Sequence, residues 1–171
     1  MDKNAGLKIT GAPSLEELHA SACYRLPSKD CNKTLAVIEC IEGIPCNPCE
    51  TACPQHAITI GSEITNIPVV DWDLCTGCGL CVAACPGLAI YLKNYNYNEE
   101  TSLITFPFEY YPLPEVGQSV TMANRFGEEI CVGTVLKVLT LKRNDKTAVI
   151  SVSYPKEFFE DVITMKRLKR E

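Results

Sequence analysis

Two cysteine-rich segments of closely similar spacing constrain this chain more than any other feature. The downstream segment has the spacing C-x2-C-x2-C-x3-C-P and places its cysteines at Cys75, Cys78, Cys81 and Cys85. A shift of 32 positions superimposes seven upstream residues on identical downstream ones, namely Cys46, Cys49, Ala52, Cys53, Pro54, Ala57 and Ile58. Only the first cysteine departs from the repeat, because Cys75 aligns with Gly43 and Cys40 lies three residues earlier. Such a duplication is far more specific than a single C-x2-C pair.

The spacing has a geometric reason. Three cysteines at positions i, i+3 and i+6 of a tight loop can direct three thiolates to three corners of one iron–sulfur cube. The small residues between them, Thr76, Gly77 and Gly79, let backbone N–H groups approach the inorganic sulfides. The fourth cysteine, next to a proline, opens a short helix and points toward another cluster. The pattern therefore predicts two [4Fe–4S] clusters.

Residues from about 35 to 93 resemble a bacterial-type two-[4Fe–4S] ferredoxin domain. The resemblance implies two ligand sets, which we call site I (Cys40, Cys46, Cys49 and Cys85) and site II (Cys75, Cys78, Cys81 and Cys53). Five residues separate Cys40 from Cys46, where the ferredoxin family usually has two. We expect the longer loop, with Gly43 and Pro45, to close on the same corner. The alternative is a three-iron cluster or a cube with a non-cysteine ligand at site I.

Zinc and disulfide bonds are the competing interpretations of the eleven cysteines. Two C-x2-C pairs would suffice for zinc, and a zinc site needs neither a third cysteine nor the C-P fourth. No hydrophobic signal segment follows Met1, so we expect a reducing, cytoplasmic compartment in which structural disulfides do not persist. Cluster ligation is therefore favoured. Cys23, Cys31 and Cys131 have no metal-like spacing and are expected to be free thiols.

The charge of the chain argues against some partners. The formal net charge is −5, and each oxidised cluster with its four thiolates adds about −2, which gives roughly −9. Such a protein repels phosphate backbones, so no nucleic-acid partner is expected. The uncharged stretch from Leu74 to Leu92 contains four cysteines and Pro86, which indicates a cluster loop rather than a membrane span.

The chain divides into three predicted zones of an α+β protein. Residues 1–34 form an arm with one capping box, Ser14 and Glu17, opening a helix over Leu15–Ala20. The arm is expected to dock on a partner, and the alternative is a frayed terminus. Residues 35–101 hold the ferredoxin domain and a linker, with the predicted strands Leu35–Glu39, Ala57–Ile60, Ile67–Asp71 and Ala89–Leu92 and the helices Glu50–Cys53 and Leu80–Cys85.

Residues 102–171 are expected to form a small antiparallel β-barrel or sandwich that serves in docking. The predicted strands are Leu103–Phe108, Gln118–Met122, Ile130–Thr140 and Thr147–Tyr154, which are rich in β-branched and aliphatic residues. A short helix is predicted over Lys156–Val162, after Pro155.

The function follows from the clusters and from the motifs that are missing. No dinucleotide-binding, P-loop or nucleophile-elbow motif occurs, so neither a flavin or nicotinamide site nor a catalytic site is expected in this chain. The function left for this chain is that of an electron carrier. The motif from Cys40 to Pro54 further resembles ferredoxin-like subunits of FAD-dependent amino-acid dehydrogenases of the proline, hydroxyproline or sarcosine type. That resemblance implies a flavoprotein partner holding FAD. The alternatives are a freely diffusing ferredoxin and an iron–sulfur regulatory sensor.

Overall fold

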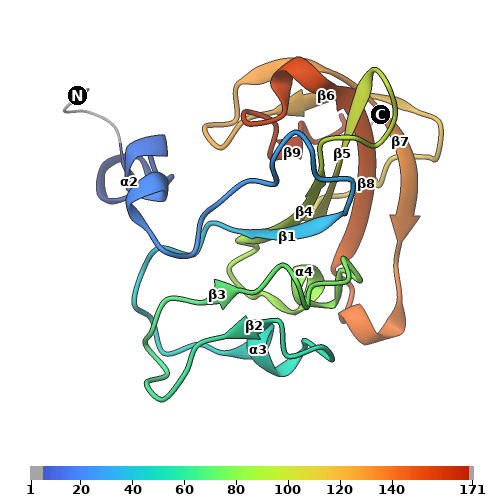
Figure 1. Cartoon of the computed structure of the whole chain (residues 1–171). Coiled ribbons are helices and arrows are strands. Elements are labelled where there is room, and N and C mark those ends of the chain that lie inside the picture. The colour runs from blue at the N-terminus through green and yellow to red at the C-terminus, as the bar shows by residue number, and fades with distance from the viewer. Residues whose placement is uncertain (1–5, 170–171) are drawn as a thin grey trace.

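The computed structural model describes residues 6–169, so that residues 1–5 and 170–171, at the outer ends of the predicted arm and C-terminal zone, lie outside it. Its main element is an antiparallel sheet of seven strands in the order β1-β4-β5-β8-β7-β6-β9 (Figure 1). The strands are β1 (Leu35–Ile38), β4 (Ile90–Asn94), β5 (Thr101–Phe108), β6 (Ser119–Ala123), β7 (Glu129–Leu139), β8 (Ala148–Pro155) and β9 (Thr164–Met165).

The cysteine-rich region contributes much shorter elements. A two-stranded sheet joins β2 (Ile58–Thr59) to β3 (Val69–Val70), and the helices α3 (Pro48–Thr51) and α4 (Leu80–Ala84) pack against each other. In Figure 1 these four elements lie below β1, and the long strands of the C-terminal zone lie above and to the right. Two further helices, α1 (Leu7–Thr10) and α2 (Leu15–Ala20), belong to the N-terminal arm.

Strand β4 connects the cysteine-rich region to the C-terminal zone. It pairs with β1 on one side, Ile38 opposite Ile90, and with β5 on the other, Leu92 opposite Thr105. Every residue of β1 and β4 is buried. The boundary expected at residue 101 therefore lies within one continuous sheet, and one apolar core spans both sides of it.

The predicted strands of both zones are present, with ends shifted by one or two residues. The prediction of a closed barrel or sandwich is wrong, because the C-terminal strands continue an open sheet whose outer strands are β1 and β9. A barrel would need those outer strands to pair with each other. The helix predicted over Lys156–Val162 is only the three-residue 3-10 helix η2 (Lys156–Phe158), and a second one, η1 (Lys142–Asn144), lies between β7 and β8.

The arm packs on its own chain. The capping box is confirmed, since Glu17 N–H donates to Ser14 Oγ at 3.2 Å and Ser14 N–H donates to Glu17 Oε2 at 2.8 Å. Leu18, Cys23 and Tyr24 of the arm are buried in the main core. These contacts order the described part of the arm, whereas its docking to a partner remains a prediction.

Trp72 ties the cysteine-rich region to both the sheet and the arm. Its indole Nε1–H donates to the carbonyl oxygen of Ala36 in β1 at 2.9 Å. The Arg25 guanidinium lies 3.9 Å from the centroid of the indole ring and donates to Val70 O at 3.2 Å. The loop after β3, which leads to Cys75, is thus held in place from two sides. Among the described residues, no helix is long and apolar enough to cross a membrane.

Candidate metal centres

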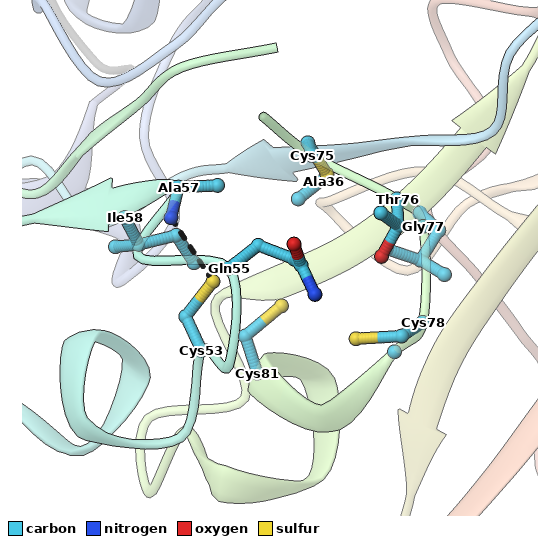
Figure 2. Close-up of a pocket in the computed structure, with 12 residues that line it drawn as sticks. Ala36, Cys53, Gln55, Ala57, Ile58, Cys75, Thr76, Gly77, Cys78 and Cys81 are labelled. Atoms are coloured by element: carbon cyan, nitrogen blue, oxygen red, sulfur yellow. Dashed lines mark hydrogen bonds between the residues drawn. The ribbon is translucent and has the colours of Figure 1, made fainter. Parts of the chain in front are cut away.

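The eight predicted ligands gather in two separate pockets. One pocket, with an empty volume of about 330 Å³, contains the four cysteines of site II: Cys53, Cys75, Cys78 and Cys81. Figure 2 shows them around one space, with Cys53 coming from the segment after α3 and the other three from the loop that leads into α4. The other pocket, of about 370 Å³, contains the four cysteines of site I: Cys40, Cys46, Cys49 and Cys85. The structure therefore brings together the two sets of four that the sequence pattern predicts.

Two glycines shape the loop at site II. Gly77 has a φ of +66° and lies so close to the backbone of Thr34 that an added Cβ would stand 2.4 Å from the carbonyl oxygen. Gly79, with a φ of +78°, is the left-handed N-cap of helix α4, which begins directly before Cys81. Both positions favour glycine over any residue with a side chain. The small residues between the cysteines thus let the loop fold tightly against β1.

The two C-P corners repeat the same local geometry. After Cys53 and Cys85, the residues His56 and Leu88 adopt left-handed conformations with φ of 51° and 52°. Each turn directs the next backbone N–H at the cysteine sulfur, Ala57 to Cys53 Sγ at 3.2 Å and Ala89 to Cys85 Sγ at 3.4 Å. Hydrogen bonds of this kind to a ligand sulfur help to set the reduction potential of a cluster.

The longer loop of site I still carries Cys40 to its pocket. It turns at Gly43, where an added Cβ would lie 3.0 Å from the carbonyl oxygen of Thr65, and Cys46 N–H donates to Ile64 O at 3.3 Å. The loop is therefore held against the residues that follow β2. Cys40 lines the same pocket as the other three cysteines, as the predicted ligand set requires.

Burial and the crowding of neighbouring cysteines raise the pKa values of several thiols in the two pockets. Burial, reinforced by the neighbouring Cys75, Cys78 and Cys53, raises the pKa of Cys81 to about 12. At site I, burial and the nearby Cys85, Cys40 and Cys46 raise the pKa of Cys49 to about 11, and burial also raises the pKa of Cys40. Four thiolates in one buried pocket repel one another, so bound iron must supply the compensating positive charge.

The donor set and its arrangement suit iron–sulfur cubes. A [4Fe–4S] cube takes four cysteine thiolates, one at each iron corner, and each pocket offers four. Within the described residues, no group of three or more His, Cys, Asp or Glu side chains is arranged to hold a single metal ion. A tetrahedral zinc site would need four sulfurs at about 2.3 Å from one point. When bound, such a cluster supplies reversible one-electron chemistry.

The other three cysteines line neither pocket. Cys23 is buried with its sulfur 3.2 Å from Ser21 Oγ, and burial raises the pKa of Cys23 as well as that of Cys131.

Sequence reasoning missed Gln55, whose side chain reaches between the site II cysteines in Figure 2. It also missed the left-handed turns at His56 and Leu88. The 32-residue shift aligns His56 with Leu88 and Gln55 with Gly87, and neither pair of residue types signals a left-handed turn or a pocket-lining side chain.

Comparisons with known proteins agree on the iron–sulfur region. The family described as 4Fe-4S binding domain matches residues 68–91. The ferredoxin-type protein NapF of Haemophilus influenzae is 38% identical over 58 residues, 33% of each chain. An uncharacterised ferredoxin of Methanocaldococcus jannaschii is 43% identical over 61 residues, 32% of this chain and 38% of that protein.

A subunit of the ion-translocating oxidoreductase complex of Methanosarcina acetivorans is 38% identical over 66 residues, 39% of this chain and 24% of that subunit. The chain thus spans between about a quarter and two fifths of the length of these relatives. No solved structure matches. None of the three relatives is named as a subunit of an amino-acid dehydrogenase, so they do not support that narrower resemblance.

The matched residues 68–91 include Cys75, Cys78 and Cys81 of site II and Cys85 of site I. Residues 68–91 thus match a 4Fe-4S binding domain, and the cysteine-rich region is similar to ferredoxin-type proteins over about a third of this chain.

Proposed function

We propose that this chain relays single electrons through two [4Fe–4S] clusters, one at site I and one at site II, as a subunit of an oxidoreductase complex. The observation that carries the proposal is the gathering of eight cysteines into two pockets of four. Four thiolates per pocket match the ligand number of a [4Fe–4S] cube.

The helices support a short path between the two sites. Cys49 of site I lies in α3, and Cys53 of site II follows the end of that helix four positions later; Cys81 of site II lies in α4, and Cys85 of site I is its C-cap, also four positions later. Helices α3 and α4 pack against each other. Each helix therefore connects one pocket to the other, and the interleaved ligands fix the separation of the clusters. A fixed, short separation is what single-electron transfer between them needs.

The relatives support a role within a larger assembly. One of them is named as a subunit of an ion-translocating oxidoreductase complex, and another, from Acetobacterium woodii, as a subunit of a Na⁺-translocating ferredoxin:NAD⁺ oxidoreductase complex. We infer a flavoprotein partner, because a flavin can collect two electrons from a substrate and release them singly to iron–sulfur clusters. An amino-acid dehydrogenase is one such flavoprotein. The experiments below identify the partner.

Metal content tests the cluster proposal directly. Protein made and purified without oxygen should contain close to eight iron and eight acid-labile sulfide per chain. Dithionite should bleach its broad visible absorbance and produce EPR spectra of two interacting reduced clusters. Stoichiometric zinc with little iron would refute the proposal, and four iron per chain would reduce it to one cluster.

A cysteine substitution tests the least regular ligand. Cys40→Ser should damage the site I cluster alone and give a three-iron EPR signal in the oxidised protein, with the site II cluster retained. Cys131→Ser is the matched control, because Cys131 lines neither pocket, and it should keep both clusters. Wild-type iron content in the Cys40 variant would show that another residue holds that corner.

The partner is tested by purification from its native host. Anaerobic isolation of the tagged chain should retain a flavin-containing subunit at a fixed ratio, and the substrate of that subunit should bleach the clusters. Recovery of the chain alone, with full cluster content, would instead favour a freely diffusing ferredoxin.

A further inference from the structure

A groove runs along the outer side of site II. One wall is the cluster loop from Thr76 to Leu80, and the other is the loop at η1, with Leu141 and Arg143. Its floor is the face of the large sheet, where strand β7 contributes Lys137 and Leu139. The empty volume is about 820 Å³. The C-terminal zone thus forms more than half of a surface that begins at a cluster ligand.

The groove contains the most accessible ligand cysteine. All eight cysteines of the two sites lie in the part of the chain that the structure describes, and Cys78 is the one classed as exposed. The other seven are buried or partly buried, Cys81 and Cys85 among the buried ones. Because an electron tunnels best over the shortest separation, the site II cluster is most accessible to a partner seated at Cys78.

The charge of the groove is opposite to that of the whole chain. Its lining contains Lys137 and Arg143, both exposed, and no aspartate or glutamate. The adjacent η1 loop adds the exposed Lys142 and Lys146, against one acidic residue, Asp145. The chain as a whole carries −5 before its clusters are counted. The basic residues of the lining and of the η1 loop, less Asp145, give a net +3, which exceeds the charge of about −2 that the site II cluster adds beside Cys78. A basic surface on an acidic protein steers a negatively charged partner to one place on it.

We propose that this groove docks an electron-carrier protein with an acidic surface around its own redox centre, and that electrons leave the chain here. The inference rests on the proposed function. The reduced site II cluster gives one electron to the oxidised carrier, so the cluster is oxidised as the carrier is reduced, and no bond forms or breaks. Leu139 and Leu141 supply an apolar contact within the basic rim, an arrangement common in specific interfaces.

Charge reversal in the groove tests the proposal on the full-length holoprotein. The test variant is Lys137→Glu with Arg143→Glu. The matched control, Lys166→Glu with Arg167→Glu, makes the same change at two exposed residues outside the groove. Iron and sulfide content are measured first in all three proteins. If every variant keeps its clusters, a change in rate or affinity reports on docking alone. If the wild-type protein itself lacks the clusters, the proposed function fails, and the docking proposal fails with it.

The first measurement is the stopped-flow oxidation of dithionite-reduced protein, freed of excess reductant, by two small complexes. At low salt, the groove variant should react about tenfold more slowly than wild type with the anion tris(oxalato)cobaltate(III), and faster with the cation hexaamminecobalt(III). The control variant should keep the wild-type ratio of the two rates. In about 0.5 M salt the differences should shrink, because screening then acts over a few ångströms.

The second measurement is binding of an acidic carrier, with a plant-type [2Fe–2S] ferredoxin as the probe in calorimetric titrations. Its Kd should rise at least tenfold in the groove variant and stay unchanged in the control. Equal rates and equal affinities in both variants would overturn the proposal. Tighter binding of a short single-stranded DNA than of the ferredoxin to the groove would also overturn it. A dimer of the wild-type protein in sedimentation, absent in the groove variant, would overturn it as well.

Discussion

The cysteine-rich region and the C-terminal strands share one core but are built in different ways. Between β1 and β4, the longest regular element is α4 with five residues, and β2 and β3 have two residues each. In the C-terminal zone, β5 and β8 pair over eight residues and β7 runs for eleven. Short elements bury little and close few hydrogen bonds, so their cross-links to iron must supply the missing stability. The long strands need no such help.

Iron removal should separate the two regions most sharply. Without iron, the crowded thiols lose their cross-links, and we expect amides between residues 40 and 89 to exchange with solvent almost freely. Amides in the β5–β8 ladder should keep most of their protection, because backbone pairs and buried side chains such as Phe106 and Ile150 hold them. Hydrogen exchange on chelated and iron-loaded protein, both kept anaerobic, measures this. Equal loss of protection in both regions would show that they fold as one unit.

Two glycines test the regions one at a time. Gly77→Ala would place a Cβ against the Thr34 carbonyl and should empty site II while leaving the site I cluster and the sheet in place. Gly133→Ala would place a Cβ 2.6 Å from Val152 Cγ1 inside the sheet. It should cost about 1–3 kcal/mol of stability with both clusters retained. Iron content and thermal unfolding distinguish the two effects.

Gly87→Ala is the matched control for both variants, because nothing lies within 4 Å of its added Cβ. It should change neither the iron content nor the melting temperature. Loss of iron in the Gly133 variant would contradict the expectation that a change in the C-terminal strands leaves the clusters in place.

A smaller effect is expected at Lys93, a fully buried residue of the shared strand β4. Its ammonium donates to the carbonyl oxygen of Phe159, and burial lowers the pKa of Lys93 to about 7. The charged groups around it are Glu39, Arg125, Asp161 and Glu160.

An unfolded lysine titrates near 10.4. Between about pH 7 and 10 the unfolded chain therefore binds more protons at Lys93 than the folded chain does, and this group makes stability rise with pH. The slope is at most about 1.4 kcal/mol per pH unit. Lys93→Met should remove that slope, whereas Lys156→Met, in a lysine bound to Asn96 Oδ1, should keep it. Urea midpoints at several pH values measure the difference. Parallel slopes in wild type and Lys93→Met would show that Lys93 keeps its proton.

The smallest effect is expected in the arm, which lies outside both regions. Ser14→Ala removes the side-chain acceptor of the α2 capping box and should cost about 1 kcal/mol. Since Leu18 of α2 is buried in the common core, the loss should appear in the unfolding of the whole protein. Ser28→Ala, outside any helix, serves as the control. Unchanged unfolding in the Ser14 variant would show that the arm unfolds independently.

The sequence signals differ between the regions, and so does what they could predict. The resemblance to two-cluster ferredoxins grouped the eight cysteines as the two pockets do, and their role as cluster ligands remains a prediction. Segments rich in β-branched and aliphatic residues located β5 to β8 within two residues, whereas β9 was missed. Neither signal could show that β4 pairs with β5, since a pairing partner depends on long-range contacts rather than local pattern. The barrel prediction was wrong for that reason.

The turns at His56 and Leu88 were missed on other grounds. A left-handed residue is usually sought at glycine, and these two side chains adopt that conformation because the corner after each C-P pair demands it. Neither histidine nor leucine marks such a turn in the sequence, so the structure was needed to reveal them.

The pairing of β1 with β4 has a consequence for how the protein is made. Strand β1 leaves the ribosome first, and its partner follows only after all eight cysteines have been synthesised, because they lie between residues 38 and 90. Until then the cysteine segment is an open loop, accessible to the cellular machinery that delivers iron and sulfide. Once β4 emerges, the loop can close, and β5 and β8 then cover the other edge of β4 and commit the polypeptide to its final form.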